Sequence, residues 1–461
     1  RAARHPYGDL KPALFFDRET FGEDRLAAGL PRKSAAPQDW QQFLVKTPLP
    51  ESARANIVRL ETGHIDYFPN LSSAEKKDKL SRMSYREFLR TYVKLDDTGI
   101  AVYQTRTHGL FGVGIDAVNA LDCWALGYPG FSGLHLEPGA TPRMGFTARG
   151  AATPQAPYSF HFPDGNASIA RALVRLLVPH AAPGHTAEDV VTAKIDYAAL
   201  DRKHTAVRVK LNSTVIHVGR EGGKASPENV VTTYIRQNRT HTVRSKHVVL
   251  ACWNMVIPYL CPELPPQQKE ALRYGVKVPL VYTAVALRNW KAFARLGVRT
   301  VTAPGMYHAS LSLEEPTVIG AYDTTPASAN DPVIVRMRRT PSKPGLSERD
   351  QHRYGHIELF NTPFETFERN IREQLARTLG PGGFDPAEDI AGITVNRWPH
   401  GYAYEYNYLF DPEWPEGQRP CDIARRRFGN IAVANSDAAA AAYTDQAIDQ
   451  AYRAVEELWA A

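Results

Sequence analysis

Cysteine is scarce in this sequence, and its spacing carries no metal or redox motif. The 461 residues include four cysteines, at positions 123, 252, 261 and 421, which are too few for a disulfide scaffold. No two of them form a CxxC pair, which argues against a zinc knuckle or a thioredoxin-type site. The absence of CxxCH excludes the covalent attachment motif of c-type haem.

Long apolar runs and blocks of one charge are also missing. No stretch reaches the ~18 apolar residues of a membrane-spanning helix. The most apolar neighbourhood, Cys252–Pro262, is interrupted by two prolines and an asparagine. The net charge is only +6, and no run of five like charges occurs. These absences argue against a membrane span and against a nucleic-acid-binding surface.

The composition that is present is globular. Hydrophobic residues make up 43% of the chain, charged residues 23% and aromatic residues 10%. With 32 glycines and 34 prolines, the sequence is neither collagen-like nor of low complexity. At ~100–200 residues per domain, the length predicts two or three domains.

Helical and extended patterns alternate along the chain. Apolar spacing predicts helices over Ala167–Leu177 and Phe364–Leu379, and a final helix that begins at the N-cap pair Thr444 and Asp445. Strands are predicted at Ala206–Leu211, Ser213–Val218, Val230–Ile235, Thr242–Ala251, Val278–Leu287, Ile390–Trp398 and Phe428–Ala434. The apolar run His247–Ala251 is typical of a buried parallel strand. This order predicts an α/β plus α+β protein with interleaved domains.

The C-terminal segment has the pattern of an anion site. A strand ends at Ala434, Asn435-Ser-Asp437 and the five alanines Ala438–Ala442 follow, and a helix opens near Tyr443. A parallel strand that leads through small residues to a helix N-terminus presents unpaired N–H groups to a ligand. The alternative is a strand-loop-helix unit without a ligand.

Tyrosines recur at every second position after Trp398. Residues 402, 404, 406 and 408 are all tyrosine, so an extended chain would place their rings on one face. Such a face suits an organic cation or a planar cofactor. An aromatic packing stripe is the alternative interpretation.

Taken together, these segments resemble the flavin-containing amine oxidase family over residues 80–461. The segments that carry the resemblance are, in order, Phe162-Pro-Asp-Gly165, Thr214-Val-Ile-His-Val218, His247-Val-Val-Leu-Ala251, Trp398-Pro-His-Gly-Tyr402, and the stretch from Gly429 to Ala447. The resemblance implies a Rossmann-like FAD-binding domain, interleaved with a mixed-sheet substrate domain. It implies that residues 157–254 and 400–461 form the FAD-binding domain, and that residues 9–156 and 255–399 form the substrate domain.

The resemblance also implies roles for individual residues. It places Val215 against the adenine, Ala251 beside the dinucleotide, and Ser436 and Asp437 near the pyrophosphate and ribitol. It places Tyr443 against the flavin face and the backbone N–H of Thr444 at the flavin pyrimidine edge, with Tyr402 or Tyr404 as the opposite wall of an aromatic cage. Tyr443, Tyr402 and Tyr404 are thus the catalytic candidates.

The sequence departs from the family pattern in three places. The GxGxxG fingerprint is absent, and because the chain begins at Arg1 we expect this segment to lie upstream. Tyr402 stands where covalent members carry a flavin-linked cysteine, which predicts non-covalent FAD. The lysine often found near flavin N5 has no match, since Lys277 is out of register.

The implied reaction is the oxidation of an amine to an imine by hydride transfer to flavin N5. Water then hydrolyses the imine to an aldehyde and a smaller amine. The resemblance implies a polyamine substrate, for which Glu405 is the candidate carboxylate, and an electron acceptor other than oxygen. Two alternatives from the same superfamily are a desaturase and a protoporphyrinogen-type oxidase. A third alternative is a non-catalytic relative that binds haem or a polyamine.

Two further expectations follow from the resemblance. Haem b is a candidate second cofactor, bound non-covalently, with His108 and His400 as candidate ligands. The protein is expected in the periplasm, or otherwise in the cytoplasm.

Overall fold

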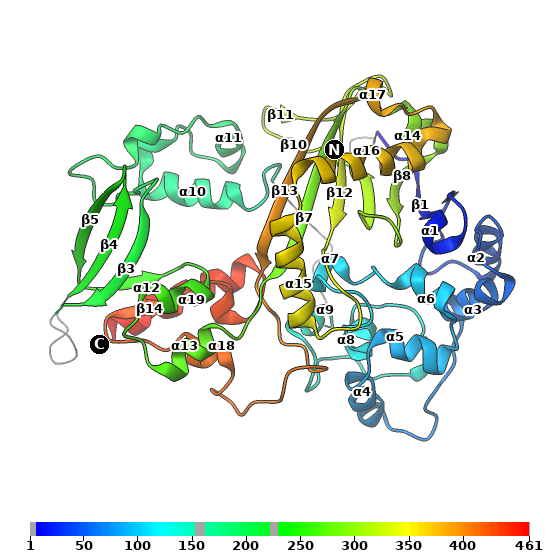
Figure 1. Cartoon of the computed structure of the whole chain (residues 1–461), viewed down its shortest axis with the longest axis horizontal. Helices are drawn as coiled ribbons and strands as arrows, with labels where there is room; N and C mark the ends of the chain where they lie inside the picture. The colour runs from blue at the N-terminus through cyan, green and yellow to red at the C-terminus, as the bar shows by residue number, and fades with distance from the viewer. Residues whose placement is uncertain (1–5, 153–161, 222–228, 461) are drawn as a thin grey trace. The chain divides into compact units, whose positions relative to one another are not determined.

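The chain forms two compact units, each assembled from segments that are distant in sequence. The computed structural model describes residues 6–152, 162–221 and 229–460 (Figure 1). Unit 1 comprises Arg1–Gln155, Val276–Glu314 and Pro326–Glu413, and unit 2 comprises Ala156–Gly275, Glu315–Thr325 and Trp414–Ala461. The predicted boundary between residues 156 and 157 lies outside the described residues.

Unit 1 is built around a seven-stranded mixed sheet with the order β13-β7-β12-β9-β8-β1-β2. The pairing of β1 with β8 is parallel, and the other five pairings are antiparallel. The strands are β1 (Lys11–Phe16), β2 (Arg25–Ala28), β7 (Val278–Leu287), β8 (Val298–Thr302), β9 (Ser310–Leu313), β12 (Val333–Arg339) and β13 (Ile390–Tyr402).

The two faces of this sheet differ in chemistry because side chains alternate along each strand. On one face, Val285, Val335 and Leu311 pack against Phe367 and Ile371 in one hydrophobic core. The last two residues belong to α16 (Phe364–Leu379), which lies along this face beside α14 (Lys291–Leu296), α15 (Glu348–Asn361) and α17 (Pro386–Asp389) (Figure 1). The other face carries serine, threonine, tyrosine and arginine, and it forms part of the candidate site.

The N-terminal part of unit 1 is a helical layer with its own core. Tyr85, Phe88 and Leu89 are fully buried there, and Leu14 and Phe16 of β1 join the same core. Its helices are α1 (Arg18–Phe21), α2 (Pro37–Leu44), α3 (Glu51–Thr62), α4 (Ser73–Ser81), α5 (Tyr85–Phe88), α6 (Asp97–Tyr103), α7 (His108–Phe111), α8 (Ala120–Ala125) and α9 (Phe146–Ala151). This layer supplies the second wall of the cavity described below.

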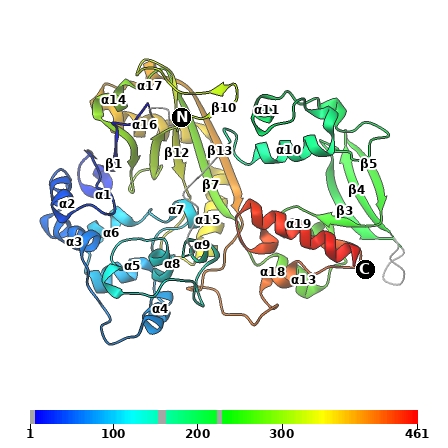
Figure 2. The ribbon, with the colours of Figure 1, turned by 180° about the vertical axis from the view of Figure 1, so that it is seen from behind.

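Unit 2 contains a parallel strand pair and an antiparallel three-stranded sheet. β6 (Val248–Leu250) pairs in parallel with β14 (Ile431–Val433). Ala454 and Leu458 of α19 (Thr444–Trp459) pack against Ala432 of β14 and Ala434, which follows this strand (Figure 2). The other sheet consists of β3 (Thr214–Arg220), β4 (Val230–Arg236) and β5 (Arg239–Ser245), and β10 (Val318–Ile319) pairs with β11 (Tyr322–Asp323). The helices are α10 (Ala167–Leu177), α11 (Ala187–Thr192), α12 (Ile257–Leu260), α13 (Pro266–Leu272), α18 (Pro420–Ala424) and α19.

The predicted fold class is confirmed, and several elements have the predicted bounds. The helices Ala167–Leu177 and Phe364–Leu379 and the strand Val278–Leu287 are found as predicted. The strand predicted at Ala206–Leu211 is wrong: Val207 and Val209 pack on a small apolar cluster without forming a strand. The predicted strand Thr242–Ala251 is two strands, because β5 ends at Ser245 and β6 pairs with β14 instead.

The final helix begins where predicted but with a different cap. Tyr443 is the N-cap residue, and no side chain caps the helix. The hydroxyl of Thr444 instead accepts a hydrogen bond from Asn166 Nδ2 at 2.5 Å. Within the described ranges, no helix combines the length and the apolar character that a membrane crossing requires.

Candidate active site

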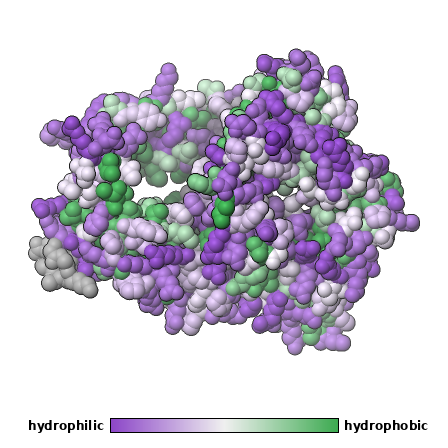
Figure 3. All heavy atoms as spheres, in the orientation of Figure 1, coloured by the Kyte–Doolittle hydropathy of each residue, from purple (hydrophilic) through white to green (hydrophobic). Residues whose placement is uncertain are grey.

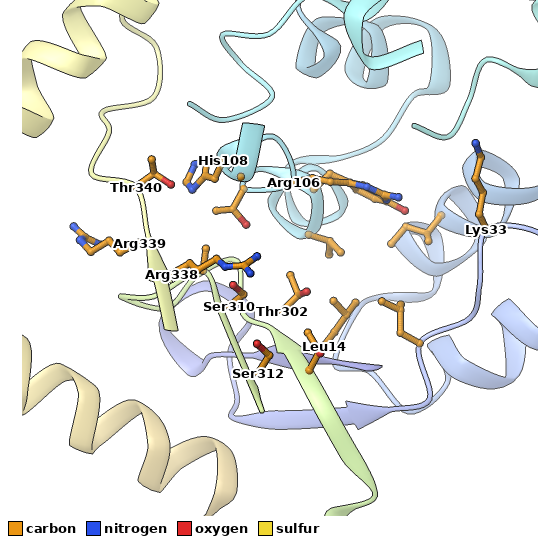
Figure 4. Close-up of a pocket in the computed structure, with 18 of the residues that line it drawn as sticks. Leu14, Lys33, Arg106, His108, Thr302, Ser310, Ser312, Arg338, Arg339 and Thr340 are labelled. Atoms are coloured by element: carbon orange, nitrogen blue, oxygen red, sulfur yellow. The ribbon is translucent and has the colours of Figure 1, made fainter. Parts of the chain in front are cut away.

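Unit 1 encloses a cavity of about 460 Å³ between its sheet and its helical layer (Figure 4). The sheet wall comes from β7, β8, β9 and β12, and the opposite wall comes from α2, α3, α6 and α7. The side chains that face the cavity in Figure 4 include Arg338, Ser310 and Thr302 on the sheet and His108 and Arg106 on the helical side. This volume is in the range of small-molecule sites.

The sheet wall is a row of hydrogen-bonding side chains held in register by strand pairing. Tyr282 of β7 lies opposite Arg338 of β12, which lies opposite Ser310 of β9, which in turn lies opposite Thr302 of β8. Ser312 lies opposite Thr300 in the adjacent row. Directly opposed residues have Cβ atoms about 5 Å apart, so the row is a continuous polar strip.

The helical wall is mainly apolar. Leu44 and Trp40 come from the buried face of α2, Ile57 comes from α3, and Leu49 lies in the connection between these helices. Trp40 is only 5% exposed, and its indole Nε1 has no hydrogen-bond partner among the described residues. An indole N–H is a donor, and a buried donor without a partner is costly. The cavity is therefore amphipathic, with one polar wall and one apolar wall.

The charges around the cavity are unequal. Its lining contains Lys33, Arg106, Arg338 and Arg339 but a single carboxylate, Glu61. The side chain of Glu61 is 4% exposed and accepts a hydrogen bond from the hydroxyl of Tyr103 at 2.8 Å. Arg106 approaches the same carboxylate at 3.4 Å, which leaves the other three cations without a counter-charge in the lining.

His108 lies in the cavity wall as a neutral imidazole. Burial is the main reason that the pKa of His108 is lowered to about 4, since burial disfavours the charged form. Its buried Nδ1 has no hydrogen-bond partner among the described residues. His400, the other candidate haem ligand, packs its ring edge-on against His356 with 4.6 Å between ring centroids. The described residues contain no metal-binding group of three or more His, Cys, Asp or Glu side chains.

The predicted tyrosine candidates lie at and just after the end of β13. The hydroxyls of Tyr402 and Tyr282 are 2.7 Å apart, which connects Tyr402 to the polar strip of the cavity. Tyr404 is buried, and its hydroxyl donates to Asp411 Oδ2 at 2.7 Å. Because β13 ends at Tyr402, Tyr404 and Tyr406 are not on an extended strand, and their rings pack edge-on 6.2 Å apart.

Glu405 is partly buried and lies beside the buried carboxyl group of Asp122. It accepts hydrogen bonds from the backbone N–H of Thr147 at 2.5 Å and from its hydroxyl at 2.7 Å, while Asp122 accepts from the N–H of Gly145 at 3.1 Å. A Cβ on Gly145 would lie 2.8 Å from Glu405 Oε1 and 3.0 Å from Asp122 Oδ2, so only glycine fits between the two carboxyl groups. Burial raises the pKa of both Asp122 and Glu405 to about 7.

A second set of buried polar groups is adjacent in sequence. Asn407 Nδ2 donates to Glu348 Oε2 and to the carbonyl of Ala117, both at 2.6 Å, and its N–H donates to Asp411 Oδ2 at 2.9 Å. Burial raises the pKa of Glu348 well above its usual value. These bonds hold the segment that follows Tyr402 in a fixed conformation.

In unit 2, the loops that follow β6 and β14 are bonded to each other. Asn435 Nδ2 donates to the carbonyl of Cys252 at 2.5 Å and to Asn254 Oδ1 at 2.9 Å. The N–H of Asn254 donates to Asp437 Oδ2 at 3.1 Å. The carboxyl ends of parallel strands meet at one edge of a sheet, which is where ligands of open α/β sheets bind.

Four of the six predicted cofactor residues follow this strand edge along one stretch of chain. Ser436 and Asp437 come directly after β14, and Tyr443 and Thr444 open α19 after the alanine-rich turn. Ala251 follows β6 on the neighbouring strand and is solvent-exposed. Val215 lies on a different sheet, on β3 opposite Tyr234, with 38% of its side chain exposed. Figure 3 shows hydrophobic residues gathered over the region of β3 and α10.

The sequence-based interpretation missed the polar strip of the cavity. The alternation Ser-Leu-Ser-Leu over residues 310–313 and Val-Arg-Met-Arg over 335–338 indicates strands with one polar face. That pattern is also typical of a solvent-exposed face. The cross-strand register that aligns Arg338 with Ser310 is not encoded in either segment alone.

Comparison with known proteins supports the fold. No protein-family model matches the sequence, and no curated protein sequence matches it either. Among solved structures, a single mutant of putrescine oxidase, from a redesign of cofactor binding, covers 98% of this chain and 81% of its own at 12% identity, with a TM-score of 0.54. A double mutant from the same redesign gives 0.53 at 13% identity, and the wild-type enzyme bound to putrescine gives 0.51 at 12%. The double mutant and the wild type each cover 98% of this chain and 82% of their own.

The chain therefore has the fold of putrescine oxidase along nearly its whole length. This finding confirms the fold that the resemblance to flavin-containing amine oxidases implies, with a Rossmann-like part and a mixed-sheet part.

Proposed function

We propose that this protein is an FAD-dependent amine dehydrogenase, in which unit 1 holds the amine and unit 2 holds the cofactor. The observation that carries the proposal is the fold of putrescine oxidase over 98% of the chain. Two features of the molecule support it. Unit 1 has an amphipathic cavity with Tyr402 bonded to its wall, and unit 2 has a parallel strand edge followed by small residues.

The residues of unit 2 fit a dinucleotide at this strand edge. The bonded loops Ala251–Asn254 and Asn435–Asp437 fix the edge, and Ala438–Ala442 let a large planar group approach the backbone. Ser436, Asp437 and Ala251 are the proposed contacts of the phosphates and ribitol, Val215 that of the adenine, and Tyr443 and Thr444 those of the ring system. The first N–H groups of α19 have no side-chain cap and are suited to negative charge. FAD, when bound, accepts the hydride that an amine carbon gives up.

The residues of unit 1 prepare the amine. An alkylamine, with a pKa near ~10.4, must lose its proton before it can give up a hydride. The apolar wall around Trp40 and Ile57 disfavours the ammonium form, as does the excess of cationic side chains in the lining. Neutral His108 adds no positive charge of its own. Tyr402 and Tyr404 are the proposed aromatic walls at the reacting carbon.

Spermidine is the specific substrate that we propose, on the basis of the motifs by which the sequence resembles bacterial spermidine dehydrogenase. The binding of putrescine by a protein of the same fold supports an aliphatic amine with more than one nitrogen. Glu405 is the proposed partner of a distal ammonium group. Its carboxyl group has a pKa of about 7 because it is buried, so a bound ammonium group would stabilise the ionised form.

Replacing Glu405 tests this assignment. We expect Glu405→Gln to raise the KM for spermidine about tenfold and to leave the KM for a monoamine unchanged, since only a distal ammonium needs the charge. Glu413→Gln is the matched control, because Glu413 is a nearby, exposed carboxylate paired with Arg143. An unchanged KM for spermidine in steady-state kinetics removes Glu405 from the substrate site.

The proposal contains FAD as the only cofactor. The resemblance alone favours haem, and neither His108 nor His400 has surroundings that indicate a haem ligand. The electron acceptor is proposed to be other than oxygen, and the periplasmic location stays an expectation. A desaturase or a protoporphyrinogen-type oxidase is less well supported, because such an enzyme needs a wide apolar tunnel, whereas one wall of this cavity is polar.

Product analysis tests the proposed activity. The FAD-loaded protein is incubated with spermidine and an artificial electron acceptor, and the products are identified by mass spectrometry. We expect an aldehyde and a smaller amine in a ratio of about one to one, because hydrolysis of one imine releases both. Conversion to an alkene without loss of an amine would favour a desaturase instead.

A further inference from the structure

We propose that the cavity of unit 1 binds a carboxylate through Arg338 and therefore also accepts a second class of ligand, an amine bearing an acidic group and a bulky apolar body. The assignment of the amine end rests on the proposed function. The assignment of the carboxylate end rests on the cavity alone.

The arginine side chains of the cavity lining differ in whether a protein group pairs with them. Arg106 is paired with Glu61, and Arg339 is paired with Glu358 and the carbonyl of Tyr307. Arg338 has no ion-pair or hydrogen-bond partner for its side chain within the described ranges. Figure 4 shows its guanidinium pointing into the cavity beside Ser310. An arginine fork with no protein partner is suited to a planar carboxylate.

The neighbours of Arg338 on the sheet are side chains with hydroxyl groups. Strand register places the hydroxyls of Ser310 and Thr302 in the same row, on the side of Arg338 away from Tyr282. These hydroxyls are donors that can share a carboxylate oxygen with the guanidinium. Tyr282, on the other side, is bonded to Tyr402. An acidic group at Arg338 would thus lie only a few bonds from an amine held near Tyr402.

The cavity lining also contains buried ring nitrogen atoms that could bond to a ligand. Trp40 and His108 both line the cavity. The Nε1 atom of Trp40 and the Nδ1 atom of His108 are buried, and neither atom has a hydrogen-bond partner among the described residues. Such atoms indicate a ligand with polar atoms, since leaving them unpaired in the bound state is costly. The leucine and isoleucine side chains beside Trp40 require that the rest of the ligand is apolar.

Calorimetric titration of the full chain tests the inference without flavin or turnover. The probe is 3-phenylpropionate, which has the acid and the apolar body but no amine, and 3-phenylpropylamine is its counterpart of opposite charge. We expect the carboxylate to bind more tightly than the amine. We expect Arg338→Gln to weaken its binding about tenfold or more, and Ser310→Ala to weaken it severalfold.

Arg336→Gln is the matched control, because Arg336 lies two residues away on the same face of β12 but is paired with Glu314. It should bind 3-phenylpropionate like the unmodified protein. The inference is overturned if the amine binds as tightly as the acid, if Arg338→Gln binds the acid normally, or if both arginine variants weaken it equally. Arg338-dependent binding together with a flavin that no amine reduces would support this inference and contradict the proposed function. Oxidation of an amine by a protein that does not bind the carboxylate would support the proposed function and contradict this inference.

Discussion

Stability that falls as the pH rises from 5 to 8 is the expected signature of the buried Asp122–Glu405 pair. Both carboxyl groups have a pKa of about 7 in the folded chain, mainly because burial disfavours their charged forms. In the unfolded chain they titrate near ~4. Between these values the folded state binds more protons than the unfolded state, so its stability decreases as the pH rises. Above pH 7 both states are ionised, and the loss levels off.

Urea unfolding at a series of pH values measures this effect. Between pH 5 and pH 8 we expect the pair alone to lower the free energy of unfolding by roughly 2–4 kcal/mol, against an opposite contribution from buried histidines such as His108, whose pKa is lowered to about 4. Asp122→Asn should flatten this dependence, even though the substitution disturbs the hydrogen bond from Asn119 at every pH. Asp350→Asn is the control, because Asp350 is exposed and hydrogen bonds to Ser347 and Arg353 lower its pKa. An Asp122→Asn variant whose free energy of unfolding changes between pH 5 and pH 8 by the same amount as that of the wild type would contradict this view of the pair.

Truncation of Phe367 should strongly destabilise unit 1. This residue of α16 is fully buried against the apolar face of the sheet, behind the strands whose other face lines the cavity. We expect Phe367→Ala to lower the free energy of unfolding by about 3–5 kcal/mol, from lost burial and the space left behind.

Phe364 provides the comparison on the same helix. It is 43% exposed, so Phe364→Ala should cost less than about 1 kcal/mol. Urea unfolding at one pH measures both variants. Similar losses in the two variants would mean that α16 does not pack on the sheet as described.

Local sequence patterns were sufficient to predict several single elements. Apolar spacing predicted Phe364–Leu379 and Ala167–Leu177 with the correct bounds, and the continuous apolar run predicted β7. The pattern failed at Ala206–Leu211, where the partly buried Val207 and Val209 pack against a small cluster but no neighbouring strand pairs with them. An alternation of apolar and polar residues therefore indicates that one side of a segment packs against apolar neighbours. It does not by itself indicate that the segment pairs with another strand.

The candidate site was less accessible to sequence reasoning than the fold. The motif around Asn435–Thr444 identified a strand edge and a helix start, because all of its parts are close in sequence. The polar strip of the cavity depends on the register of four strands, and the Asp122–Glu405 pair joins residues 283 positions apart that meet at Gly145. Tertiary packing alone brings such groups together.

An anaerobic absorption spectrum of the FAD-loaded protein, recorded before and after the addition of an amine, tests the central claim most directly. The additions are spermidine, putrescine, an amino acid with a bulky apolar side chain, and sodium chloride as the blank. The account predicts that at least one amine bleaches the flavin band and that the blank does not. A flavin that is bound and remains oxidised with all three amines would contradict it.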